Sequence, residues 1–288
     1  FENSNEDYHA LYEVDGYAWF HGGRNFVDPN PIANGASRKF TLKNIPGNTQ
    51  ATAFVSVSAG NNTNVQVEFN DSVVGNISIR CGEYDKGNVG SLTFTAKNLK
   101  DENEVKITTL KDGPSRLDYI CLTYQNPRPA TTLAGNTFPA AQYVHNITNQ
   151  NRHADGFADM VIIIPTSQKT AAQAQRLKAF HEEHEKMRVN IVPADELYNE
   201  FSSGTPDANA YRRYLKMLYD RAETEADMPK YLLLFGDGLW DNRMITPATA
   251  GMNSDDYLLC FESENSYNEI YCYVDDGFFC LLDEGEGS

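Results

Sequence analysis

The stretch YLLLFGDGLWDNR, residues 231–243, decides the fold class of this chain, because an apolar strand runs directly into Gly236-Asp237-Gly238. A continuous apolar run of this length is typical of a strand in a parallel sheet covered on both faces. Polar side chains at the carboxyl end of such a strand lie where α/β enzymes form clefts. The stretch therefore predicts an enzyme-like α/β scaffold.

Two more strands of the same kind occur earlier in the chain, at 160–164 and 189–192. Between them, apolar residues at steps of three and four predict a helix of about five turns. Its buried stripe would hold Ala174, Leu177, Phe180, His184 and Met187. Two further helices, one capped by Asp195 and one ending near Ala222, are expected before residue 231. This order of elements implies right-handed crossovers and an open parallel sheet.

The first part of the chain, from 17 to 124, shows a different pattern, in which apolar and polar residues alternate with a period of two. Half-buried strands produce this alternation, and turn-rich segments separate them. The pattern predicts an antiparallel β-sandwich. In residues 116–124 both the odd-numbered and the even-numbered positions have large side chains, so both faces of this strand are expected to be covered. We therefore expect the strand to lie centrally in its sheet.

These patterns divide the chain into three parts. Residues 1–127 are expected to form the β-sandwich domain, 128–156 a connector, and 157–288 the α/β domain. After Arg243 the helical periodicity stops. Short aromatic strands are expected in this last part, at 257–261, 269–273 and 278–282, as an accessory layer.

The net charge of −16 and the pI of about 4.7 limit the classes of partner. An acidic chain without a basic stripe repels nucleic acid and anionic membranes, so neither is expected as a partner. The acidic surface favours solubility, and attraction of cations or basic peptides is the alternative interpretation. No run approaches the roughly 18 to 20 apolar residues of a membrane-spanning helix. Because Phe1 opens a polar stretch, we expect a soluble piece that begins within a longer protein.

The nucleophilic and imidazole side chains show no catalytic pattern. The five cysteines lack Cys-x-x-Cys spacing and lie within apolar strands or in the sandwich; they are Cys81, Cys121, Cys260, Cys272 and Cys280. Cys272 and Cys280 could pair as a disulfide, and buried thiols are the alternative. His181 and His184 are three residues apart, whereas zinc peptidase helices space their histidines by four. No catalytic residue is therefore assigned.

Several carboxylates gather near the carboxyl end of the chain. Asp275, Asp276 and Asp283 are candidate ligands for a hard cation such as calcium, with Glu284 and Glu286 beside them. The segment lacks the twelve-residue order of an EF-hand, and solvated acidic turns are the alternative. Calcium is the one cofactor that the sequence suggests.

Several segments resemble the gingipain family of cysteine peptidases, most closely its sortase branch in type IX secretion. The segments that carry the resemblance are 159–165, 197–204, 232–243, Asp275-Asp276 and Leu282-Asp283. The residues 16–20 and 117–120 resemble the β-domain that precedes the peptidase domain in that branch. Weak similarity therefore covers nearly the whole chain.

The resemblance implies a partial caspase-like α/β fold and a role in proteolysis. In this family the catalytic histidine follows a Gly-His motif and the cysteine comes later, and this chain contains no Gly-His pair. The expectation is an inactive amino-terminal part of a cysteine endopeptidase (a hydrolase) or sortase that is secreted or located at the bacterial outer membrane. Protein or peptide substrates and other components of the secretion machinery would be its partners.

A binding protein of another class is the alternative hypothesis. In this interpretation the sandwich recognises a glycan or an exported protein, and the α/β part is a degenerate peptidase scaffold. Exposed aromatic side chains would be the anchors, with Trp19, Tyr84 and Trp240 as candidates and core packing as the alternative role for each.

Overall fold

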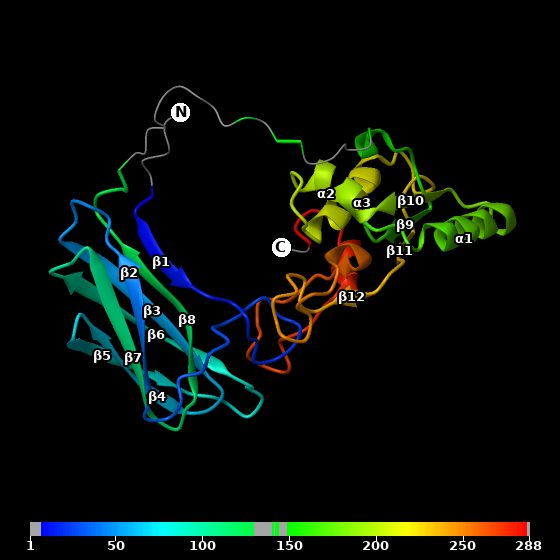
Figure 1. Ribbon diagram of the computed structural model, residues 1–288. Helices are drawn as coiled ribbons and strands as arrows, with labels where there is room; N and C mark the ends of the chain where they lie inside the picture. Colours follow the sequence, from blue (N-terminus) through cyan, green and yellow to red (C-terminus); the bar gives the residue numbers. More distant parts are fainter. Residues whose placement is uncertain (1–6, 130–139, 141, 144–148, 287–288) are drawn as a thin grey trace. The chain divides into compact units, whose positions relative to one another are not determined.

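The computed structural model describes residues 7–129, 140, 142–143 and 149–286 of the chain, which form two compact units (Figure 1). The first unit holds the described residues up to Tyr143. The second unit begins at Asn149 and contains most of the remaining chain.

The first unit is a sandwich of two four-stranded antiparallel sheets, which confirms the predicted fold class. One sheet has the order β1-β8-β3-β6, with β1 (His9–Glu13), β3 (Gln50–Ala59), β6 (Asn88–Lys97) and β8 (Ser115–Thr123). The other has the order β2-β7-β4-β5, with β2 (Ser37–Lys43), β4 (Thr63–Phe69), β5 (Ser72–Ile79) and β7 (Glu102–Lys111). The strand β8 lies between β1 and β3, as its two-sided apolar pattern predicted.

The core of the sandwich consists of the residues that the period-two pattern places on the inner faces. Val55 and Val57 of β3 and Val65 and Val67 of β4 are fully buried. Because successive side chains of a strand point to opposite faces, the residues between them face outward. Asn70, at φ 46°, begins the turn between β4 and β5, where a left-handed backbone suits a hairpin.

The second unit contains a three-stranded parallel sheet of order β10-β9-β11. Its strands are β9 (Met160–Ile164), β10 (Val189–Pro193) and β11 (Tyr231–Leu234), and β9 pairs in parallel with both neighbours. The residues Val161 to Ile164 are buried on both faces. This confirms the parallel arrangement predicted from the continuous apolar runs.

Helices cover both faces of this sheet (Figure 1). The helix α1 (Ala171–His184) packs on the face that carries Ile162 and Ile164. The helices α2 (Ala194–Phe201) and α3 (Asn209–Arg221) pack on the face that carries Val161 and Ile163. Because successive side chains of β9 point to opposite faces of the sheet, the strand contributes to two small hydrophobic cores, one under α1 and one under α2 and α3.

The predicted stripe of α1 is only partly correct. Ala174 is the buried residue of this helix, while Phe180 is 49% exposed and His184 is exposed. The helix ends at His184, so Met187 lies outside it. In the last turn the ring of Phe180 packs on the ring of His184, 4.7 Å between centroids, rather than on the sheet.

The segment after β11 contains less strand than the aromatic runs predicted. Its regular elements are β12 (Gly238–Leu239), β13 (Leu258–Leu259) and the short 3-10 helices η2 (Ser254–Asp256) and η3 (Asp276–Cys280); η1 (Arg152–Ala154) precedes β9. The expected strand at 278–282 was wrong, because Asp275 accepts a hydrogen bond from the backbone N–H of Gly277 and starts a 3-10 turn. The expected strand at 269–273 is not formed either.

Neither of the two compact units is a single continuous stretch of the sequence. Ile245–Pro247 and Glu264–Cys272, which follow the parallel sheet in the chain, belong to the unit that contains the sandwich. The α/β unit is thus interrupted twice in sequence.

Candidate functional site

A cleft of about 600 Å³ lies at the carboxyl edge of the parallel sheet in the second unit. The segment after β9 contributes Pro165 and Ser167, the segment after β11 contributes Gly236 and Asp237, and η2 contributes Asp256. Ligands of open α/β sheets bind at this edge. The cleft therefore lies where the Gly-Asp-Gly stretch predicted it.

Two glycines allow close packing here: Gly236, which lines the cleft, and Gly238, which follows it in the chain. A Cβ on Gly236 would lie 2.7 Å from Pro165 Cγ, and one on Gly238 would lie 2.4 Å from Cys260 Sγ. The second close approach accompanies the short parallel pairing of β12 with β13, in which Gly238 lies opposite Leu258. The glycines therefore serve close packing of the loop.

The charged groups at the cleft are mostly carboxylates. Lys169 Nζ lies 2.7 Å from Asp256 Oδ2, and this hydrogen bond lowers the pKa of Asp256. Burial raises the pKa of the nearby Asp195. Asp237 adds a further carboxylate at the rim. Because Lys169 is already paired, the lining favours a cation or a basic side chain, and among the residues described at this cleft none is a cysteine or a histidine.

Two of the cysteine thiols, those of Cys260 and Cys81, have raised pKa values. Cys260 is half-buried, and burial, with Asp276 and Glu262 nearby, raises the pKa of its thiol to about 11. Burial also raises the pKa of Cys81. An attacking cysteine needs a lowered pKa. Cys272 and Cys280 are both free thiols, which agrees with the thiol interpretation; Cys272 is buried as expected, whereas Cys280 lies exposed in η3.

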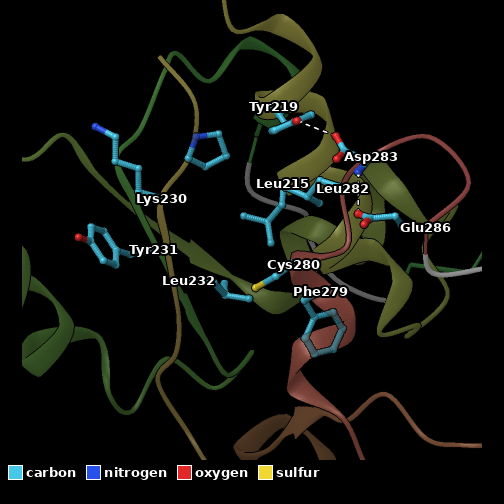
Figure 2. Close-up of a pocket in the computed structure, with 11 residues that line it drawn as sticks. Leu215, Tyr219, Lys230, Tyr231, Leu232, Phe279, Cys280, Leu282, Asp283 and Glu286 are labelled. Carbon is cyan, nitrogen blue, oxygen red and sulfur yellow. Dashed lines mark hydrogen bonds between the residues drawn. The ribbon is translucent and has the colours of Figure 1, made fainter. Parts of the chain in front are cut away.

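A second cavity, of about 240 Å³, lies between β11, α3 and the last described segment of the chain (Figure 2). Leu232 and Phe279 form its apolar wall, and the thiol of Cys280 points into it. On its polar side the hydroxyl of Tyr219 donates to Asp283 Oδ1 at 2.7 Å. The cavity thus contains one of the predicted calcium ligands.

The other predicted calcium ligands lie in η3 and its cap. Asp275 caps the 3-10 helix through the Gly277 N–H, and Asp276 lies in its first turn. Within the described ranges, no group of three or more His, Cys, Asp or Glu side chains could hold a metal ion. The calcium site at Asp275, Asp276 and Asp283 stays a prediction, and an unchanged melting temperature on addition of calcium would end it.

Two histidines of the α/β unit have carboxylate partners, and one of them, His181, belongs to the pair His181/His184 considered above as metal ligands. His181 Nδ1 lies 2.7 Å from Glu185 Oε2, and His153 Nδ1 lies 2.7 Å from Glu200 Oε2. No pattern in the sequence predicts the contact of His153 with Glu200, because the two residues are 47 positions apart.

Comparison with known proteins identifies the class of the second unit. Residues 153–278 match the model of Peptidase family C25, so the chain contains a domain of this family, the gingipain family. This confirms the resemblance found in the sequence. No curated protein matches the chain.

Among solved structures, the dimeric latent PorU from Porphyromonas gingivalis has a TM-score of 0.78 and 21% sequence identity, over 97% of this chain and 35% of that chain. The likeness shows the fold of a β-sandwich followed by a partial caspase-like α/β domain. The chain thus spans about a third of the length of that structure.

Two smaller solved structures match less than half of this chain. A family 35 carbohydrate binding module from an environmental isolate has a TM-score of 0.31 and 16% identity, over 47% of this chain and 98% of that chain. A CBM35 from Cellvibrio japonicus Abf62 has a TM-score of 0.29 and 13% identity, over 42% and 95%. Scores at this level support no argument about fold or function.

Among the described helices, none is long and apolar enough to cross a membrane.

Proposed function

We propose that this chain is the non-catalytic amino-terminal part of a gingipain-like cysteine endopeptidase or sortase that processes exported proteins. The family match over residues 153–278 carries the proposal. The fold shared with PorU, the sortase of type IX secretion, supports it. Protein substrates, secretion partners and a place at the bacterial cell surface follow from the same likeness and belong to the proposal.

The raised pKa of the Cys260 thiol and the residues that line the cleft support the proposal that this chain has no peptidase activity of its own. A cysteine peptidase needs a thiolate, a base within hydrogen-bond reach and donors for the oxyanion. In this chain the pKa of the Cys260 thiol is raised, and the cleft is lined by carboxylates, hydroxyls and one paired lysine. The reacting cysteine and histidine would come from sequence beyond Ser288, where the cysteine would attack the peptide carbonyl and the histidine would transfer protons.

The experiment compares this chain with a version extended through its natural reading frame. We expect the extended protein to cleave peptides and this chain to show no activity above buffer. Replacing the cysteine downstream of a Gly-His motif with alanine should abolish the activity of the extended protein. Peptide hydrolysis by residues 1–288 that disappears on alkylation of the thiols would contradict the proposal.

One observation favours the binding hypothesis as a second candidate function. In register across β1, β8, β3 and β6, the residues Leu11, Cys121, Phe54 and Thr93 form one outward row. Leu11 is 59% exposed, and Tyr119 stacks on Phe54 with 5.4 Å between ring centroids. Aromatic and apolar side chains on an outer sheet face are typical of recognition surfaces.

This row does not contain the three anchors that the sequence suggested, of which Tyr84 is 48% exposed. Trp19 is a packing residue, because its indole N–H donates to Ser58 Oγ at 3.0 Å and Gly87 lies against its ring. If the sandwich binds a glycan, Phe54→Thr should abolish the signal on a glycan array. Val73→Thr, at a 60% exposed position of the opposite sheet, is the matched control. An array without any bound glycan would remove this candidate.

A further inference from the structure

The segment Glu264–Cys272, here called the strap, belongs to the unit of the sandwich although it follows the parallel sheet in the chain. The residues on either side of it belong to the α/β unit and pair with each other. Glu262 forms an antiparallel bridge with Val274, and the N–H of Ser263 donates to the carbonyl of Tyr273 at 3.0 Å. The strap is therefore the tip of a stem that starts and ends in the α/β unit.

Backbone hydrogen bonds hold the strap to two loops of the sandwich. The carbonyl of Ser266 accepts from Phe20 N–H at 2.9 Å, and its Oγ accepts from Asn25 N–H at 2.9 Å. The carbonyl of Tyr267 accepts from the N–H groups of Lys86 and Gly87, at 2.7 and 3.1 Å. Ser266 is fully buried. The strap thus satisfies polar groups of the sandwich that would otherwise need water.

The fit between the strap and the first of these loops is steric as well as polar. A Cβ on Gly23 would lie 2.1 Å from the carbonyl oxygen of Asn265 and 2.4 Å from its carbon. Both atoms are backbone, so a side chain at residue 23 cannot be accommodated by a rotamer change. Gly23 therefore allows the strap to approach.

Charges on the two surfaces are complementary. Lys86 Nζ lies 2.6 Å from Glu269 Oε2, and Arg24 Nη2 lies 3.1 Å from Glu264 Oε1. In addition, Asn268 Nδ2 donates to Asp85 Oδ1 at 2.8 Å. In a chain with net charge −16, these basic residues of the sandwich select an acidic segment.

From these contacts we infer that the strap is a second attachment of the sandwich to the α/β unit, independent of the covalent connector at 128–156. The loops that contain Gly23 and Lys86 form a docking surface, and its partner is the acidic segment Glu264–Cys272 of the same chain. Proteolytic cleavage of the connector therefore leaves the sandwich bound. Release of the sandwich requires the hydrogen bonds and ion pairs of the strap with these loops to break.

The test uses the full chain with a specific protease site inserted within 128–156. After cleavage, the wild-type strap should keep both pieces together, so that they elute from a sizing column at the volume of the uncut 32.3 kDa chain. The same cleavage of a Gly23→Ala protein should give two separate peaks. Gly156→Ala is the matched control, because nothing lies within 4 Å of a Cβ at that position.

Two further measurements separate loss of the strap from loss of the fold. Hydrogen exchange on the uncut Gly23→Ala protein should show lost protection at Phe20, Asn25, Lys86 and Gly87, with β3 and β4 still protected. A Lys86→Glu substitution should increase the fraction of released sandwich, and adding Glu269→Lys should restore retention. Separation of the cleaved wild-type pieces, or retention of the Gly23→Ala pieces equal to that of Gly156→Ala, would overturn the inference.

Discussion

The carboxylate of Glu200, on α2, accepts an unusual number of hydrogen bonds and offers a quantitative test of the α/β unit. Its donors are the Gln150 side chain at 2.7 Å, the Arg152 N–H at 2.7 Å, the His153 N–H at 2.9 Å and His153 Nδ1 at 2.7 Å. These donors lie at the start of the unit, before β9. Glu200 therefore fixes this segment to α2.

The pKa of Glu200 gives the size of the effect. Burial raises the pKa, but the hydrogen bonds from Arg152, Gln150 and His153 outweigh it and lower the pKa from 4.5 to about 2. The difference between a pKa of 4.5 and one of about 2 corresponds to about 3 kcal/mol as an upper limit. Partial solvent screening reduces this, so we expect Glu200→Gln to lower the free energy of unfolding by about 1.5 to 2 kcal/mol at pH 7.

The same shift fixes the direction of the pH dependence. Since the folded pKa lies below the unfolded value of 4.5, the contribution of Glu200 is fully present above pH 4.5. It is lost as the pH falls from about 4.5 to about 2, where the folded carboxylate takes up its proton. As the pH falls through this range, the free energy of unfolding of Glu200→Gln should therefore decrease less than that of the wild type.

The assay is urea unfolding at several pH values, followed by hydrogen exchange of peptides from α2 and β9, which report this unit alone. Glu183→Gln is the matched control, since Glu183 is an exposed residue on α1. If Glu200→Gln unfolds within about 0.5 kcal/mol of the wild type at pH 7 and keeps the same acid dependence, the reasoning is refuted.

Three more predictions concern the same unit. Asp159→Asn should lower the free energy of unfolding by about 1 to 2 kcal/mol at neutral pH, as a thermal melt at pH 7 would show. Arg188 donates to both carboxylate oxygens of Asp159, at 3.0 and 3.1 Å, and these hydrogen bonds hold its pKa well below 3.8. Tyr211→Phe should cost about 1 to 2 kcal/mol, since its hydroxyl pairs with Tyr198 at 2.6 Å and accepts from a backbone N–H, and an unchanged urea midpoint would contradict this. Iodoacetamide at pH 8 should modify the exposed Cys280 before Cys260, as mass spectrometry of the peptides would show.

Periodicity in the sequence was sufficient for the layers of both units. The alternation of Val55 and Val57 with polar residues predicted a sheet with one buried face, and the run at 160–164 predicted a strand covered on both. It failed for Phe180, because apolar spacing on a helix does not tell how far the neighbouring sheet extends. It also failed at η3, where the local hydrogen bond of Asp275 outweighs the strand propensity of the aromatic residues that follow.

The sequence alone determined the order of elements from β9 to β11, the parallel direction of their sheet and the position of the cleft after β11, because these depend on local patterns of burial and on chain connectivity. Only the tertiary structure decided which distant segments meet. The contact of Asn25 with Ser266 joins residues 241 positions apart, and that of His153 with Glu200 joins residues 47 apart. Such contacts leave no periodic trace, since backbone amides donate to whichever acceptor the folded chain brings to them.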